Sequence, residues 1–152
     1  MKSFILGLCV YFIMGSYAHA QTFPVLSGEC RDTSHIAEGE IGTDLTKRES
    51  RFFCDSLIIN NISGDKNHFM LQFSEKESHH LPILAFSGYT TDDKSIIKLE
   101  HIYFQPGIPT IVSDGWCRFF FDGAALKDLM CGAKVDETGR RTVAIVEFQL
   151  KK

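Results

Sequence analysis

Four side chains that could bind a metal ion stand close together near the middle of the chain: Glu75, Glu77, His79 and His80. If a strand continues through this segment, Glu75, Glu77 and His79 share one face, and two carboxylates with an imidazole can ligate a divalent cation. The same residues suit a solvated loop between two strands, and the sequence favours that interpretation. We therefore expect no bound cofactor, with a metal carrier as the alternative.

Ser87 and the cysteines are the candidate nucleophiles. Ser87 lies in the sequence Phe-Ser-Gly-Tyr and lacks the glycine two positions earlier that a hydrolase nucleophile elbow requires. Cysteines held in disulfides have no thiolate with which to attack a substrate. His101 sits among alternating apolar residues, which indicates a hydrogen-bonded core histidine rather than a catalytic one. The sequence leans against an enzyme.

A polar segment with a possible recognition role runs from Ser87 to Asp93. Asp92 and Asp93 lack the alternating oxygen ligands of a calcium loop, so we interpret them as a charged turn. Binding residues are often carried by loops on a rigid scaffold. Ser87, Tyr89, Asp92 and Asp93 are therefore candidate interaction residues.

Residues 87–91 carry one resemblance to a known family. Their sequence, Ser-Gly-Tyr-Thr-Thr, is similar to the Ser-Gly-x-x-Tyr inhibitory loop of the periplasmic lysozyme inhibitors, which are small exported β-barrels with a disulfide. The resemblance covers five residues, and Thr91 stands where that family has its tyrosine. It implies inhibition of a secreted hydrolase such as lysozyme as an alternative function.

Aromatic residues are concentrated between positions 116 and 121. Trp116, Phe119, Phe120 and Phe121 are more than one strand face needs, and the two-residue period of a strand places Trp116, Arg118 and Phe120 on one side. We expect the N-terminal arm to cover this side. The alternative is an exposed interaction patch, because aromatic side chains beside arginine are typical of binding hot spots.

The first 20 residues have the three parts of a secretory signal. Lys2 precedes an apolar stretch at residues 4–13, and Ala-His-Ala at residues 18–20 matches a cleavage site. The apolar stretch is too short to span a bilayer, so we expect removal of the signal, no membrane span, and a periplasmic or secreted location. The formal net charge of −3 lacks the basic excess of a nucleic-acid binder.

Four cysteines follow the expected signal: Cys30, Cys54, Cys117 and Cys131. An even number in an oxidising compartment predicts two disulfides, and four cysteines allow three pairings. Spacing favours Cys30–Cys54 with Cys117–Cys131, because each pair closes a short local loop. The alternative of a zinc site lacks the Cys-x-x-Cys spacing.

Turn residues divide the rest of the chain into short runs rich in β-forming residues. Phe69, Leu71 and Phe73 share one face of the clearest run, as in a half-buried strand. Between residues 96 and 104, the odd-numbered positions, His101 among them, are the better core face. We expect one helical turn at residues 124–129 and strands at residues 52–59, 68–74, 81–86, 96–104, 110–121, 129–135 and 142–150.

These elements predict an all-β fold with one domain. About seven strands joined by short turns, without crossover helices, indicate an antiparallel β-sandwich or a small β-barrel; the sequence does not choose between them. We expect residues 21–50 to form an irregular N-terminal arm, with room for one short strand or helical turn, that packs as one unit with a β domain at residues 51–152.

The sequence therefore favours an exported, non-enzymatic β domain that binds a protein or a cell-envelope component. The alternatives are a carrier of a small ligand or metal and an inhibitor of a secreted hydrolase. The identity of the partner and the oligomeric state are not specified by the residues.

Overall fold

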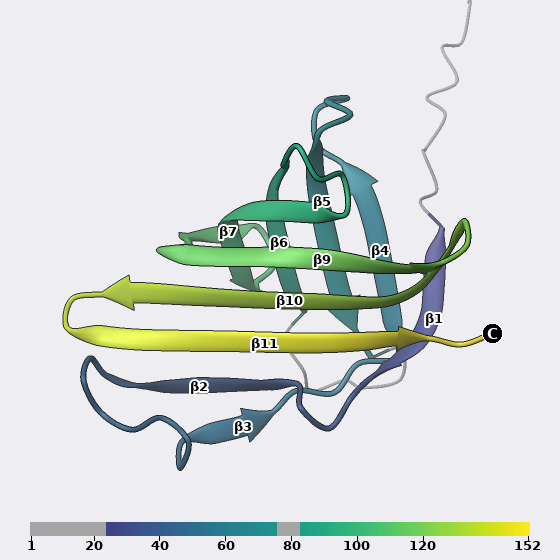
Figure 1. The fold of residues 1–152 in the computed structure, drawn as a ribbon. Helices are drawn as coiled ribbons and strands as arrows, with labels where there is room; N and C mark the ends of the chain where they lie inside the picture. Colours follow the sequence, from purple (N-terminus) through teal and green to yellow (C-terminus); the bar gives the residue numbers. More distant parts are fainter. Residues whose placement is uncertain (1–23, 76–82) are drawn as a thin grey trace, which may run out of the picture.

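The structure is a computed structural model that describes residues 24–75 and 83–152 of the 152-residue chain. The described residues form eleven strands and no helix (Figure 1), so no helix among them could cross a membrane, and the expected all-β class is confirmed. The expected signal at residues 1–20 lies outside the described residues. The strands are β1 (Val25–Cys30), β2 (His35–Glu40), β3 (Glu49–Arg51), β4 (Ser56–Asn61), β5 (His68–Ser74), β6 (Leu84–Thr90), β7 (Ile96–Gln105), β8 (Ile108–Ile111), β9 (Asp114–Asp122), β10 (Ala125–Glu137) and β11 (Arg140–Leu150).

The antiparallel sheet closes on itself. Its hydrogen-bonded order is β1-β4-β5-β6-β7-β9-β10-β11, and β1 also pairs with the end of β11, which makes a small flattened barrel. In Figure 1, β9, β10 and β11 lie side by side in one layer, the first part of β7 runs beside β9, and β4, β5 and β6 run steeply behind them. The order continues from β11 to β2 and β3, while β8 pairs with β7. Because the sheet closes, the fold is a barrel and not an open sandwich, a choice that the sequence does not make.

The N-terminal segment contributes more structure than an irregular arm. Strand β1 pairs with both β4 and the last residues of β11, and β2 pairs with residues 140–145 of β11. Strand β1 includes Ser27, Gly28 and Glu29, which give no apolar alternation to detect. Its pairing partner β11 is more than a hundred residues away in the chain. This segment therefore becomes a strand because of its tertiary contacts and not because of its local sequence.

The expected helical turn at residues 124–129 is wrong. Strands β9 and β10 form a hairpin around Gly123, whose positive φ of 61° suits a tight turn. The pairing then shifts between Leu126 and Asp128, which leaves Lys127 as an extra residue in β10. This bulge interrupts the two-residue period that would have indicated a strand.

Apolar side chains fill the barrel interior. Phe73 contacts Phe86 and Phe148 edge-on, with ring centroids 6.0 and 5.9 Å apart, respectively. These rings belong to one buried cluster, to which strands of both layers contribute side chains. The largest fully buried side chains are Phe73, Phe86, Phe148, Leu57, Leu71, Leu84, Ile97, Ile102, Leu129, Val146, Cys117 and Cys131.

A bulge in β7 reverses the expected core face of that strand. Ser87 lies opposite His101 and Gly88 lies opposite Leu99, so Glu100 is an extra residue in β7. Beyond it the even-numbered Ile102 is fully buried, whereas His101 belongs to the outward side and is only partly buried. The interpretation of His101 as a core residue is therefore wrong, because one inserted residue changes the phase of the strand.

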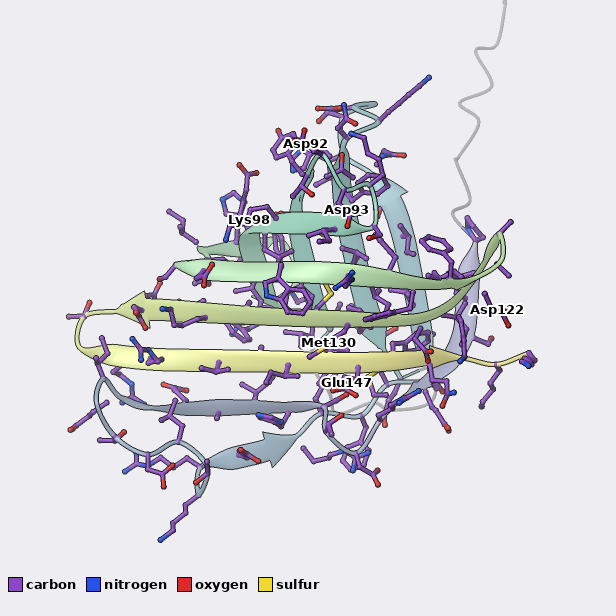
Figure 2. The ribbon with its side chains drawn as sticks, in the orientation of Figure 1. Asp92, Asp93, Lys98, Asp122, Met130 and Glu147 are labelled. Carbon is purple, nitrogen blue, oxygen red and sulfur yellow. A yellow bond between two sulfur atoms is a disulfide. The ribbon has the colours of Figure 1, made fainter. Side chains whose placement is uncertain are left out.

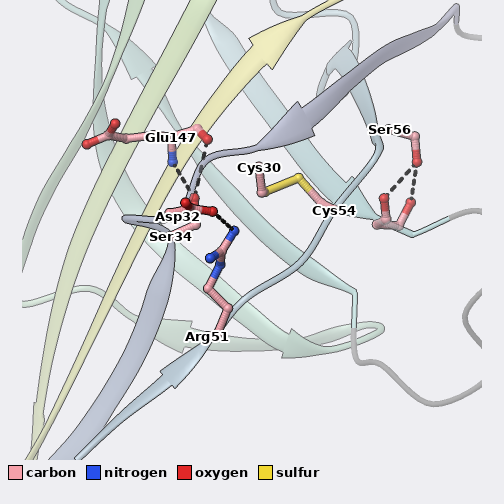
Figure 3. The surroundings of a disulfide bond; sticks show 8 residues. Cys30, Asp32, Ser34, Arg51, Cys54, Ser56 and Glu147 are labelled. Carbon is pink, nitrogen blue, oxygen red and sulfur yellow. Dashed lines mark hydrogen bonds and ion pairs between the residues drawn. A yellow bond between two sulfur atoms is a disulfide. The ribbon is translucent and has the colours of Figure 1, made fainter. Parts of the chain in front are cut away.

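Both disulfides follow the pairing that spacing favours. Cys117 and Cys131 lie directly opposite each other in β9 and β10, with Cα atoms 4.0 Å apart. Cys30, at the end of β1, is joined to Cys54, just before β4 (Figure 3). One disulfide fixes the register of a hairpin and the other attaches the N-terminal strands to the barrel.

Gly88 should tolerate no side chain. A Cβ at this position would overlap the carbonyl oxygen of Lys98, because β6 and β7 approach closely at the bulge. We expect Gly88→Ala to lower the free energy of unfolding by about 2 kcal/mol, measured by urea denaturation.

Gly132→Ala is the matched control, since a Cβ there would meet nothing within 4 Å. This variant should stay within about 0.5 kcal/mol of the wild type. Equal stability of the two variants would contradict the close approach at the bulge.

Each disulfide should contribute strongly to stability. The closed loops have sequence separations of 24 for Cys30–Cys54 and 14 for Cys117–Cys131. Because longer loops lose more entropy when closed, replacing the first pair with alanines should cost about 3.5 kcal/mol and replacing the second about 3 kcal/mol. Urea denaturation measures both losses; a loss below about 1 kcal/mol for either pair would refute its structural role.

Candidate interaction surface

The strand register joins two groups of candidate residues that are far apart in the sequence. Tyr89 of β6 lies opposite Lys98 of β7, and Lys98 lies opposite Trp116 of β9. In the next row, Ile96 of β7 lies opposite Arg118 of β9. Because directly opposed residues share a face of the sheet, Tyr89, Lys98, Trp116 and Arg118 point out of the barrel together.

We call Tyr89, Lys98, Trp116, Arg118 and Phe120 the aromatic face. Tyr89 is 40% exposed, and Trp116 and Phe120 are each 41% exposed. The expectation that the N-terminal arm covers Trp116 and Phe120 is therefore wrong. The strands of the arm pair at the edges of β4 and β11 instead of crossing the outside of β9.

Charged side chains on this face are held by their neighbours. The guanidinium of Arg118 lies over the Phe120 ring, 5.7 Å from its centroid, in a cation–π contact. The Lys98 ammonium donates to the Asp114 carboxylate at 2.6 Å. This hydrogen bond and the Lys98 charge lower the pKa of Asp114. Both cations are thereby oriented beside exposed aromatic rings.

Tyr89 is fixed from the opposite side by His68. The two rings are stacked with centroids 4.1 Å apart, and the His68 Nε2 atom is 3.7 Å from a carboxylate oxygen of Glu100. That nitrogen is buried and has no hydrogen-bond partner among the described residues. A ring packed in this way loses less conformational entropy on binding than a free one.

The turn after β6 confirms the charged-turn interpretation of Asp92 and Asp93. The Asp93 carboxylate accepts hydrogen bonds from the Oγ of Ser95 at 2.7 Å and from its backbone N–H at 2.9 Å. These bonds, more than the charge of Arg118, lower the pKa of Asp93. Asp92 is exposed, and Figure 2 shows both aspartates at the turn between β6 and β7.

The turn is also attached to the aromatic face. The backbone N–H of Phe119, between Arg118 and Phe120, donates to the Ser95 carbonyl at 2.8 Å. Asp93 and the aromatic face are thus parts of one continuous surface, although the sequence presented them as separate candidates.

Ser87 does not belong to this surface. It is 1% exposed within β6, and its Oγ lies 3.4 Å from the Tyr103 hydroxyl. Residues 87–90 are strand, so the segment that resembles an inhibitory loop begins inside the sheet and leaves it only at Thr91. Ser87 is accessible neither to a substrate nor to a partner.

The structure places one of the four candidate metal ligands. Glu75 follows β5 and is partly buried, whereas Glu77, His79 and His80 lie outside the described residues. Within residues 24–75 and 83–152, no group of three or more histidine, cysteine, aspartate or glutamate side chains could hold a metal ion.

Sequence reasoning missed a groove next to the aromatic face. Its volume is about 460 Å³, and Phe120 belongs to both the groove and the face. Figure 2 shows Met130 and Glu147, two of its lining residues, on the neighbouring strands β10 and β11. In the sequence, strand alternation indicates only that these residues face outward. The pairing of β10 with β11, which brings them together, produces no pattern in the local sequence. The remaining lining residues are Arg31, Phe121, Lys127, Asp128, Leu129 and Phe148.

Comparisons of the chain with protein-family models, with curated proteins and with solved structures gave no match.

The low pKa of Asp93 provides a test of the turn. Ser95→Ala removes the hydroxyl donor, the largest cause of the shift, so the pKa of Asp93 should rise toward the ordinary range of an aspartate. NMR titration of the carboxyl carbon measures this change. Because a depressed folded-state pKa stabilises the fold above the unfolded-state pKa, the stabilising effect disappears as the pH falls through the folded value.

Asp44 is an internal control for this titration. Its pKa is lowered by the equivalent hydrogen bonds from Thr46, and it should keep that low value in the Ser95→Ala protein. A pKa of Asp93 that stays unchanged in the variant would contradict the hydrogen-bonded turn.

Proposed function

We propose that this protein is a non-enzymatic binding domain that recognises a partner protein through its aromatic face. The observation that carries the proposal is the continuity of Tyr89, Trp116, Arg118 and Phe120 on one exposed side of the sheet. Tryptophan, tyrosine and arginine are the side chains most enriched at the energetic centres of protein interfaces.

The rigidity of the supporting strands favours recognition. Cys117 lies between Trp116 and Arg118, and its disulfide to Cys131 ties β9 to β10 directly beneath the aromatic face. Few degrees of freedom remain to be lost when a partner binds, so more of the contact energy contributes to affinity. A disulfide-stabilised barrel suits this task.

The burial of Ser87 supports binding over catalysis. The serine considered as a nucleophile is inaccessible, and the four described cysteines are all in disulfides. The exposed aromatic rings, in contrast, have no described element over them. We therefore assign the aromatic face a binding role.

The disulfides also bear on the compartment. Two disulfides are compatible with an oxidising location outside the cytoplasm. We propose that the protein acts in the periplasm or after secretion, where its partner is either another exported protein or a protein of the cell envelope.

The partner can be identified from the face itself. A photo-crosslinking amino acid at position 98, between Tyr89 and Trp116, should capture the partner in the producing cells, and the captured protein can then be purified. In calorimetry with that protein, Trp116→Ala and Phe120→Ala should each weaken binding by about 2 kcal/mol, roughly thirtyfold.

Ile41→Ala is the control for this experiment, because Ile41 is 47% exposed but lies after β2, away from the aromatic face. Its affinity should equal that of the wild type. Trp116 is the single tryptophan of the chain, so its fluorescence should shift to shorter wavelength when the partner covers it. Wild-type affinity in both alanine variants at the face would refute the proposal.

A further inference from the structure

Two surface grooves beside the aromatic face are continuous. The groove that contains Phe120 shares Arg31 and Glu147 with a second groove of about 790 Å³. The second groove lies along the Cys30–Cys54 disulfide, in the region drawn in Figure 3. Its other lining residues are Glu29, Asp32, Thr33, Arg51, Phe53, Glu75 and Gln149. We call the two together the joined groove.

Each cationic side chain of the joined groove is already paired. Arg31 and Lys127 both approach the carboxylate of Asp128, at 3.1 and 3.9 Å. Arg51 binds Asp32 at 2.7 Å and lies over the Phe53 ring, 4.9 Å from its centroid. Among the described lining residues, none of these cations forms an ion pair with another acid of the groove.

The described lining residues of the joined groove comprise five acids and three cations, which gives a net charge of −2. Glu29, Glu75 and Glu147 make no ion pair with any described residue, and all three line the second groove. Such a concave surface has a negative potential and attracts a positively charged group. The opposite end of the joined groove carries the apolar side chains Phe120, Phe121 and Met130, beside the paired Lys127 and Asp128.

The apolar end and the acidic end meet between two opposed residues. Met130 of β10 lies directly opposite Glu147 of β11, and both point out of the barrel. Directly opposed Cβ atoms are about 5 Å apart. One extended chain that crosses this point can contact the methionine and the carboxylate with side chains one or two positions apart, since strands advance about 3.3 Å per residue.

We propose that the joined groove binds a segment of the partner protein in which a lysine or arginine lies within two positions of an apolar side chain. The inference rests on the proposed function, because it names the chemistry of the partner that covers the aromatic face. The apolar side chain packs on Phe120, Phe121 and Met130, and the cation binds Glu147. The net negative charge of the lining residues disfavours an anionic occupant such as a lipid headgroup or a nucleic-acid backbone.

Short capped peptides test this specificity on the wild-type protein. The probes share a Gly-Ser context and carry Leu-Ser-Lys, Leu-Ser-Gln, Leu-Ser-Glu or Ser-Ser-Lys at their centre. In titrations followed by NMR at low salt, the Leu-Ser-Lys peptide should bind about fivefold more tightly than the Leu-Ser-Gln peptide, and the Leu-Ser-Glu peptide should bind most weakly among those with leucine. High salt should abolish the preference for lysine.

Variants assign the preference to named residues. Glu147→Gln should remove the preference for Lys over Gln but keep that for Leu over Ser, whereas Met130→Ala should weaken all leucine peptides. Glu137→Gln is the matched control, because Glu137 is an exposed carboxylate at the far end of β10. It should leave every affinity unchanged.

The outcomes separate this inference from the proposed function. If all peptides bind equally, or the acidic peptide binds best, the inference is overturned while the loss of partner binding in Trp116→Ala can still stand. If Glu147→Gln keeps the preference for lysine, the assigned residue is wrong and the inference fails. Dimerisation of the free protein that Glu147→Gln abolishes would identify a second copy as the occupant and would also overturn it.

Discussion

The pairing of β11 along both of its edges is the constraint on which the rest of the structure depends. One edge binds β10 over ten residue pairs, and the other binds β2 and then β1. The contact with β1 closes the ring of strands and gives the sheet an inside and an outside. Because apolar side chains fill the inside, the chemistry available to other molecules is confined to the outer surface.

Closure also decides which side chains reach that surface. Once Phe148 and Cys131 point inward, alternation forces Glu147 and Met130 outward on their strands. Strand β7 has buried residues on both sides of the extra residue Glu100. The buried positions are odd-numbered before it and even-numbered after it. The outward row through Lys98 is therefore a consequence of packing the core. Trp116 is held in that row by Cys117, its disulfide-bonded neighbour.

Local patterns carried much of the fold. The strand at residues 68–74 was predicted with the bounds that the structure has, because its buried residues alternate without interruption. The even number of cysteines predicts two disulfides, and their spacing predicts the observed pairing. The sequence allows a short strand in residues 21–50 but does not locate β1, since Gly28 is placed by its contact with β11 and not by an apolar period. The bulge at Glu100 was equally invisible, because an extra residue is defined only by the strand opposite it.

The candidate site shows the same division between local and long-range information. Trp116, Arg118 and Phe120 were selected from one segment and Tyr89 from another, yet only the intervening strand β7 shows that they share a face. Their exposure could not be predicted either, because it depends on where the N-terminal strands pair. The alternation of a single strand names its outward residues but not the residues beside them on the next strand.

The arrangement of charges explains why a surface of this kind can be selective. Apolar contacts with Phe120 and Met130 contribute affinity for many side chains, since burial of hydrocarbon depends little on direction. Glu147 is a carboxylate that no described cation neutralises. It attracts a positively charged side chain of the bound segment and repels a negatively charged one, so it makes binding selective for charge. Arg31 forms its ion pair with Asp128, so it does not neutralise the Glu147 carboxylate. Affinity and selectivity thus arise from adjacent residues of β10 and β11, and the barrel holds both in a fixed relation because those strands pair along ten consecutive residues.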